Sequence, residues 1–298
     1  MADVSAPAEN RDSLNGFLFA LSAYLLWGFL PLYMKALAHI SPAEVIAHRI
    51  LWSIPVAGLL LIILKRTDEL KKAMRNPRML GMAAVTATLI SVNWGIYVWA
   101  IGTGHALDTA LGYFINPLFS ILMGAVLLKE RLKKTQIAAL ALVVLAVVIL
   151  TVEAGRLPVV ALALTFSWGF YAFFRKTLPI GPNQGFLLEV LLLSPIALGY
   201  LIYLNLQGGG HFLMGNMTDT ILLASAGLVT AVPLILYANG AKLLRLSTIG
   251  IMQYIAPSMI FITAVFVFNE PFSMAKAVAF PLIWSALVIY TLPMLRQR

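Results

Sequence analysis

Long apolar runs, separated by short segments rich in charged residues, glycine and proline, fill the chain from residue 16 onward. A bilayer core about 30 Å thick requires about 20 apolar residues per helix, and each run has this length. The runs predict ten membrane-spanning helices at residues 16–37, 43–64, 79–101, 106–128, 134–152, 157–175, 182–204, 218–240, 247–268 and 274–294. The first run is longer than the hydrophobic core of a signal peptide, so we expect it to stay attached behind a polar tail at residues 1–15.

Composition excludes several classes of protein. Of the 298 residues, 61% are hydrophobic and 11% are charged, whereas soluble domains carry roughly a quarter charged residues. The chain contains no cysteine, which excludes thiol chemistry and cysteine-ligated metals. We therefore expect an all-α polytopic membrane protein that uses neither a metal nor another cofactor.

The basic residues are distributed unevenly between the two sides of the predicted bundle. Of 21 lysines and arginines, 17 lie in the tail, the C-terminus and alternate loops, while the opposite loops carry only Lys35, Arg156 and Lys276. Basic residues near span ends stay on the cytoplasmic side. We expect a bacterial inner-membrane protein with both termini in the cytoplasm. This asymmetry accounts for the net charge of +9 without a nucleic-acid partner.

The sequence contains an internal repeat. Trp27, Gly28 and Phe29 recur as Trp168-Gly169-Phe170, and the later matches keep an offset of 140 residues. These matches are Pro42 with Pro182, Pro55 with Pro195, Tyr97 with Tyr237, Pro117 with Pro257 and Glu130 with Glu270. Five helices per repeat is an odd number, so the second half must enter the membrane from the opposite side. Such inverted repeats are typical of secondary transporters.

The repeat divides the chain into four parts. We expect a cytoplasmic tail, two five-helix repeats and a short cytoplasmic C-terminus, at residues 1–15, 16–152, 157–294 and 295–298.

Several strings resemble the RarD-like branch of the EamA family, in the drug/metabolite transporter superfamily. They are A-Y-L-L-W-G-F-L-P-L-Y-M-K, H-R-I-L-W-S, L-G-Y-F-I-N-P-L, F-R-K, L-R-L-S-T-I-G and Q-Y-I-A-P. The resemblance runs from about residue 16 to 294. It implies ten helices in two inverted repeats around a central cavity, and export of amino acids, drugs or metabolites. The Gly-Glu common at the ends of the fourth and ninth helices of this superfamily is here Lys129-Glu130 and Asn269-Glu270.

Three ionisable residues inside predicted spans are candidates for charge or proton coupling. Arg49 and Glu189 occupy equivalent positions, six or seven residues inside their helices, and charges in the membrane need a partner or water. Arg49 is a candidate for holding a substrate carboxylate, with Lys35 and Lys176 adding basic character, and Glu189 for carrying a proton. A structural charge network is the alternative. His48 follows Glu44 by four residues, which suits either a proton relay or an interfacial hydrogen bond.

Polar and aromatic residues recur at corresponding places in both halves and are candidates for substrate binding, because amides facing lipid are costly. The set comprises Trp27, Asn93, Trp94, Tyr97, Tyr113, Asn116, Trp168, Tyr237, Gln253 and Tyr254. Hydrogen bonds that hold helices together are the alternative for the amides, and interfacial anchoring is the alternative for the tryptophans.

Prolines within spans remove a backbone hydrogen bond and free the carbonyl four residues earlier. Pro31, Pro117 and Pro257 are therefore candidate hinges, with a static bend as the alternative. Glu130 and Glu270 at helix junctions are expected to cap the helix that follows. Asp108 is expected to be an N-cap.

Taken together, these features favour an alternating-access carrier that exports small organic solutes and is coupled to protons. The phosphate-binding loop of a primary pump and the common catalytic motifs are missing from the sequence. A solute channel and an intramembrane enzyme are the alternatives of other classes. The expected partners are a small-molecule substrate and the lipid bilayer, with the chain a monomer or a homodimer.

Overall fold

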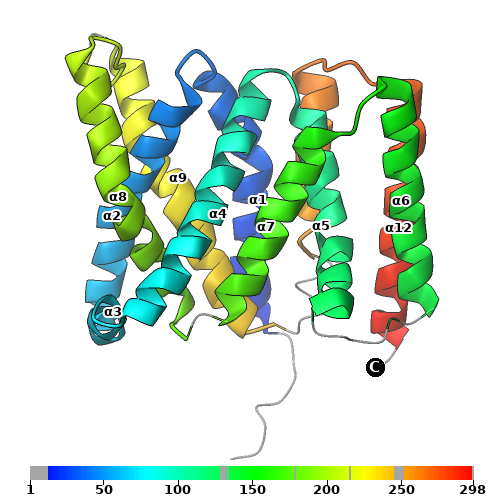
Figure 1. The fold of residues 1–298 in the computed structure, drawn as a ribbon, viewed down its shortest axis with the longest axis horizontal. Coiled ribbons are helices and arrows are strands. Elements are labelled where there is room, and N and C mark those ends of the chain that lie inside the picture. Colours follow the sequence, from blue (N-terminus) through cyan, green and yellow to red (C-terminus); the bar gives the residue numbers. More distant parts are fainter. Residues whose placement is uncertain are drawn as a thin grey trace, which may run out of the picture.

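The computed structural model describes residues 13–127, 132, 134–177, 179–214, 216–244 and 252–296, and this part of the chain is a bundle of helices without strands (Figure 1). The helices are α1 (Leu14–Ala36), α2 (Pro42–Ile63), α3 (Thr67–Met74), α4 (Pro77–Gly102), α5 (Ala106–Leu127), α6 (Lys134–Ala154), α7 (Val159–Thr177), α8 (Pro182–Leu206), α9 (Met217–Lys242), α11 (Ile255–Ile262), the π-helical η1 (Thr263–Val267) and α12 (Met274–Arg296).

The apolar runs of the sequence became helices. The predicted ranges of α1, α2, α4 to α9 and α12 match the observed ones to within about two residues at each end. Six helices in the described part, α1, α2, α4, α6 and most of α8 and α9, are long and apolar enough to cross a membrane. The chain is an all-α polytopic membrane protein.

Two segments differ from the prediction. Thr67–Met74, expected to be loop, forms the short helix α3, with Asp68 and Glu69 in its first turn and Lys71 and Lys72 in its last. These charges complement the helix dipole, and a search for apolar runs does not detect such a helix. The expected span at 247–268 begins outside the described residues, and its described part is α11 followed by η1.

Side chains of polar residues fix where several helices begin. The Ser13 hydroxyl accepts a hydrogen bond from the Gly16 N–H at the start of α1. The Asn76 side chain accepts from Arg78 and Met79 at the start of α4, and Asn216 accepts from Thr218 at the start of α9. These caps satisfy N–H groups that would otherwise be unpaired in an apolar medium.

Glu270 caps a helix far from it in sequence. Its carboxylate accepts hydrogen bonds of 2.7 and 2.9 Å from the N–H groups of Ala106 and Leu107, at the start of α5. The capping role is as predicted, but the capped helix is not the one that follows Glu270. Asp108, expected to be the N-cap, lies within the first turn of α5 and pairs with Lys276 at 3.7 Å. Glu130 lies outside the described residues.

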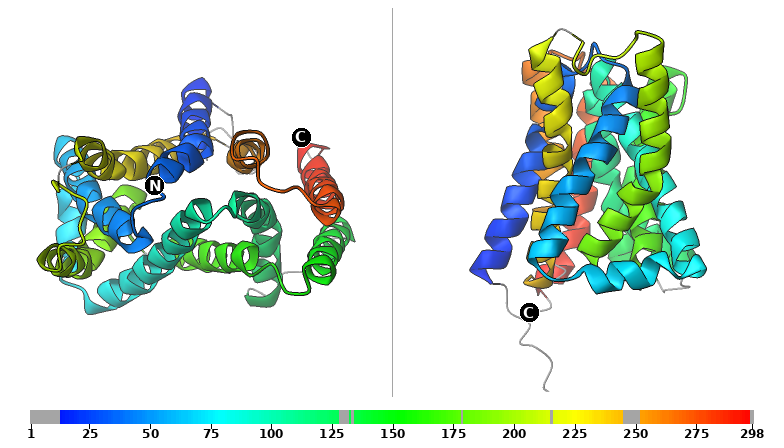
Figure 2. Two further views of the ribbon diagram at one scale, coloured as in Figure 1. Left: turned by 90° about the horizontal axis from the view of Figure 1, so that it is seen from above. Right: turned by 90° about the vertical axis from the view of Figure 1, so that its left-hand side faces the viewer.

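The helices pack in a consistent set of pairs. Helix α1 packs against α9 and α11, and α7 packs against α4 and α5. Helix α2 packs against α8 and α9, and α6 packs against α12. Seen from above, α2 and α8 lie at one end of an elongated outline, and α6 and α12 lie together at the other (Figure 2).

The bundle has two ends along the helix axes. One end, here named the α3 end, holds α3, the start of α1 and the last turn of α12 (Figure 1). The other end, here named the loop end, holds the α1–α2 and α8–α9 connections (Figure 1).

Glycines allow close contact between helix backbones. A Cβ atom at Gly227 of α9 would lie 2.1 Å from the backbone carbonyl carbon of Trp52 in α2. At Gly112 of α5 it would lie 2.7 Å from the carbonyl oxygen of Ala161 in α7. Small residues at helix contacts are the means by which membrane helices gain packing energy.

The Gly227 contact can be tested directly. We expect Gly227→Ala to destabilise the folded protein by about 1–3 kcal/mol, the usual cost of overpacking, because the new methyl group meets rigid backbone. Gly199→Ala is the matched control, since nothing lies within 4 Å of a Cβ at that position. Thermal unfolding of the detergent-purified variants measures both. Equal melting temperatures for the two variants would contradict the contact.

Candidate functional site

Arg49 of α2 lies buried within the bundle, with an exposed fraction of 3%. Its Nε donates a 3.0 Å hydrogen bond to the hydroxyl of Thr230 on α9. Its guanidinium lies over the ring of Trp94 on α4, 4.7 Å from the ring centroid. Arginine stays charged in proteins, so these contacts hold a fixed positive charge inside an apolar bundle.

Three tyrosines from three helices surround this charge. Tyr33 of α1, Tyr97 of α4 and Tyr113 of α5 all interact electrostatically with Arg49. The rings of Tyr97 and Tyr113 are 5.9 Å apart, and the Tyr33 hydroxyl is held on α9 by the Leu222 carbonyl and by Ser225. With Thr230 included, five helices meet around one guanidinium, which we name the Arg49 centre.

Three buried polar atoms at or near the Arg49 centre have no hydrogen-bond partner among the described residues. They are Nη1 of Arg49, the hydroxyl oxygen of Tyr97 and Nε2 of His48. Unpaired buried donors are costly, and where they persist they frequently mark a place for a ligand or water.

The sequence candidates Trp27 and Tyr237 form a second cluster. Trp27 of α1 lies 5.5 Å from Tyr237 of α9 and 5.6 Å from Tyr24, measured between ring centroids. Tyr24 and Tyr237 also meet edge to face. Trp27 is partly buried and packed against other apolar side chains, so it does not serve as an exposed interfacial anchor.

Trp168 and Glu189 belong to a third cluster. Trp168 of α7 lies 5.7 Å from Tyr171, whose hydroxyl donates to the Glu189 carboxylate at 3.3 Å. The equivalent charges Arg49 and Glu189 therefore each have a separate polar partner. Asn93 donates hydrogen bonds to the Leu164 carbonyl and to the Ser167 hydroxyl on α7. These bonds join two helices, which is the alternative to substrate contact that the sequence left open for the amides.

The remaining candidates are three polar residues and three prolines. Asn116 of α5 is buried, Tyr254 stacks on Phe114 at 6.5 Å, and Gln253 is partly buried. Pro31 and Pro117 lie inside α1 and α5 as predicted. Pro257 lies in the first turn of α11, where a missing N–H interrupts no bond within that helix.

Glu44 and His48 do not pair with each other as the sequence spacing suggested. The Glu44 carboxylate accepts from the His211 N–H at 2.7 Å and meets the His211 ring Nδ1 at 2.8 Å. His48 accepts a hydrogen bond from the Trp52 indole and packs against Phe212. The α8–α9 connection covers the start of α2 and supplies His211, a contact that no local pattern encodes.

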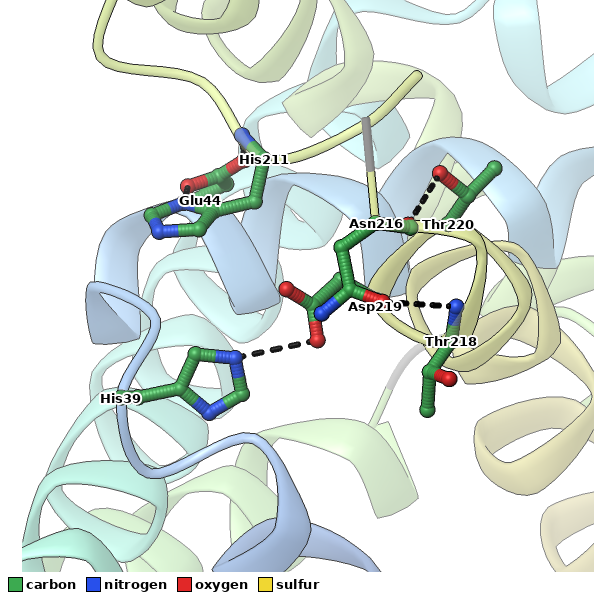
Figure 3. A network of polar contacts seen from close by, with 7 residues as sticks. All are labelled: His39, Glu44, His211, Asn216, Thr218, Asp219 and Thr220. Atoms are coloured by element: carbon green, nitrogen blue, oxygen red, sulfur yellow. Dashed lines mark hydrogen bonds and ion pairs between the residues drawn. The ribbon is translucent and has the colours of Figure 1, made fainter. Parts of the chain in front are cut away.

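A second histidine–carboxylate pair lies beside the first at the loop end (Figure 3). His39, in the α1–α2 connection, contacts Asp219 of α9 at 3.0 Å, and the rings of His39 and His211 lie 6.0 Å apart. These pairs link the two halves of the chain. Sequence reasoning missed them because each residue lies at a span end and has its partner in the other half.

At the α3 end, a side-chain hydrogen bond also joins the two halves of the chain. Gln184, at the start of α8, donates a 2.8 Å hydrogen bond to Glu69 of α3. Gln184 and Glu44 are equivalent by the 140-residue offset. Lys176, also singled out in the sequence, lies in α7, with a side chain outside the described part.

Comparison with known proteins places the chain among bacterial transporters. Residues 14–152 match the model of the EamA-like transporter family. An "uncharacterized transporter" of Vibrio cholerae is 40% identical over 95% of this chain and 94% of its own length. "Protein RarD" of Streptomyces exfoliatus is 40% identical over 97% and 91%, and "Protein RarD" of Escherichia coli is 37% identical over 95% and 96%.

A solved crystal structure adds evidence on the fold alone. It superposes with a TM-score of 0.61 over 95% of this chain and 98% of that one, at 20% identity. Because the relatives exceed 30% identity over nearly the whole chain, the protein belongs to the EamA-like transporter family and is a RarD-like member of it.

Proposed function

We propose that this membrane transporter is a secondary active exporter that moves small organic solutes across the bacterial inner membrane by alternating access. Proton coupling through His48 or Glu189 is part of the proposal, with Arg49 supplying a fixed positive charge. The observation that supports this proposal is the symmetric set of contacts between helices of the two halves. A carrier of this kind needs two conformations of similar energy, which a repeated fold supplies.

The packing pairs support two inverted five-helix repeats at residues 16–152 and 157–294, ten helices in all. The two halves are compared by exchanging each helix for its equivalent: α1 with α7, α2 with α8, α4 with α9, α5 with α11 and α6 with α12. This exchange converts the α1–α9 contact into the α7–α4 contact. The same exchange converts α5–α7 into α11–α1, and leaves α2–α8 and α6–α12 unchanged. The capping residues Asn76 and Asn216 also differ by 140.

The basic residues support an orientation for the bundle. The α3 end carries Lys65, Arg66, Lys71, Lys72, Arg75 and Arg78 in one connection. By the tendency of basic loops to remain inside, the α3 end faces the cytoplasm, together with the tail at 1–15 and the C-terminus at 295–298. The loop end then faces outward.

Contacts at each end support alternating opening. The loop end is joined by Glu44 with His211 and by His39 with Asp219, whereas the α3 end is joined by Gln184 with Glu69. Each contact links one half to the other, so opening either end requires that its contacts break. Pro31 and Pro117 lie within the helices that would bend.

The substrate site that we propose lies between these ends, around the Arg49 centre. Its members are the candidates Trp27, Asn93, Trp94, Tyr97, Tyr113, Asn116, Trp168, Tyr237, Gln253 and Tyr254. Asn93 has its side-chain NH2 group engaged by α7 and acts by positioning α4 against that helix. The chain works as a monomer or a homodimer on a small-molecule substrate.

The inverted repeat makes a prediction about sidedness. Equivalent connections must emerge on opposite faces, so a cysteine at Ala38 and one at Pro179 should react from opposite sides. The natural chain has no cysteine, which gives a clean background. In intact cells we expect a membrane-impermeant maleimide to label Ala38→Cys, and to label Pro179→Cys only after permeabilisation. Labelling of both from one side would contradict the repeat.

Counterflow into proteoliposomes tests the carrier itself. We expect saturable uptake of labelled solute that depends on unlabelled solute inside. Flux that is linear in concentration would instead indicate a channel, and chemical conversion an enzyme. We expect Trp168→Ala to reduce transport at least about fivefold, because aromatic contacts to a substrate are worth on the order of 1 kcal/mol or more.

The control for this variant is Trp99→Ala. Trp99 is a more exposed tryptophan on α4, outside the proposed site. Full transport by Trp168→Ala with normal insertion would remove Trp168 from the site.

The two ends make a prediction about gating. A cysteine introduced by Ser225→Cys serves as the reporter. We expect Glu44→Met to raise the rate at which this cysteine is labelled from the loop end by about tenfold, because hydrogen bonds to a charged group are lost. The matched variant is Glu69→Ala, which breaks the contact at the α3 end. It should lower the same rate, since opening one end favours closure of the other. Equal effects of both variants would contradict alternating access.

A further inference from the structure

Among the residues that the structure describes, no carboxylate pairs with the positive charge of the Arg49 centre. The ion pairs found in the described part of the chain are His39 with Asp219, Lys71 with Asp68, His211 with Glu44 and Lys276 with Asp108. Arg49 belongs to none of them. The three tyrosines that interact with it are neutral phenols at ordinary pH and supply no balancing charge.

An unbalanced arginine within a membrane bundle requires an explanation. Charged residues in spans normally face a partner or a water-filled path, and mark the places where ions or substrates bind. Only 3% of the Arg49 surface is exposed. Thr230 binds its Nε and Trp94 covers one face, while Nη1 has no hydrogen-bond partner among the described residues.

The free donors match a carboxylate. Nη1 of Arg49 and the hydroxyl of Tyr97 are both buried and have no partner among the described residues. A carboxylate offers two oxygens that accept hydrogen bonds, and arginine binds this group strongly. One guanidinium balances one negative charge, so a second carboxylate on the ligand would be left unbalanced.

We propose that Arg49 and Tyr97 form a carboxylate subsite, and that the solutes carried are organic monocarboxylates with an apolar or aromatic body. The rings of Trp94, Tyr97 and Tyr113 supply the surface for that body. This inference rests on the proposed carrier function and names its substrate class.

A purely structural role for Arg49 makes the opposite prediction about stability. If the residue mainly joins α2 to α4 and α9, its removal should lower the melting temperature of the ligand-free protein. If it awaits an anion, Arg49→Gln should leave that temperature unchanged or raise it, because an unpaired buried charge disappears.

Thermal unfolding of the full chain in detergent measures both properties. The probes are benzoate, phenylacetate and hexanoate, each compared with its neutral amide. We expect at least one carboxylate to raise the melting temperature of the natural protein in a concentration-dependent manner, and its amide to have little effect. Arg49→Gln should lower the affinity for this carboxylate at least about tenfold, and Tyr97→Phe should lower it severalfold. Each variant loses a hydrogen bond to a charged group.

Arg156→Gln, at an exposed position, is the matched control and should respond as the natural protein does. The inference is overturned if no carboxylate stabilises more than its amide, if chloride stabilises as well as the carboxylates, or if Arg49→Gln retains the full response. It is also overturned if Arg49→Gln lowers the ligand-free melting temperature and Tyr97→Phe binds normally. Because these assays measure binding in detergent, their failure is separate from a failure of counterflow.

Discussion

Polar groups inside this bundle must find their partners within the protein, because the surrounding hydrocarbon offers none. The Glu270 carboxylate meets the first N–H groups of α5, Asn93 joins α4 to α7, and Glu44 meets His211. Each of these contacts fixes one helix relative to another. The same requirement gives the unpaired Nη1 of Arg49 and the unpaired hydroxyl of Tyr97 their meaning, since a buried donor without a partner among the described residues is costly.

Close backbone contact is what brings those partners together. Gly227 lets α9 lie directly against α2, and this contact carries Thr230, three residues later on α9, to the Nε of Arg49. Trp94 and Tyr97 approach from α4, one turn apart on that helix. The Arg49 centre therefore depends on small residues that have no chemistry of their own, and a larger residue at Gly227 would displace a polar contact as well as an apolar one.

The sequence determined the helices far better than it determined the partners. Apolar runs predict spans because every span obeys the same hydrophobic requirement, and caps such as Asn76 and Asn216 lie next to the helices that they begin. No local sequence pattern indicates which residues hydrogen-bond to each other across the bundle. Glu270 caps a helix that starts 164 residues earlier, and Glu44 binds His211 at a separation of 167 residues, while its near neighbour His48 binds Trp52. The helix α3 was missed because it is short and polar, with Leu70 and Ala73 as its buried residues, so it contains no long apolar run.

Positions separated by 140 residues carry different chemistry in the two halves, and in the carrier that we propose this difference would make the two ends unequal. A perfectly repeated bundle would open equally well at either end. Here position 44 has a glutamate bound to an imidazole, while its equivalent at 184 has an amide bound to a carboxylate. Likewise Arg49 stands where the second half has Glu189. The loop end is therefore held by contacts between carboxylates and imidazoles, whereas the α3 end is held by a contact between a carboxylate and an amide. In the mechanism that we propose, opening each end would then break a different kind of contact, and the two ends would open at different cost.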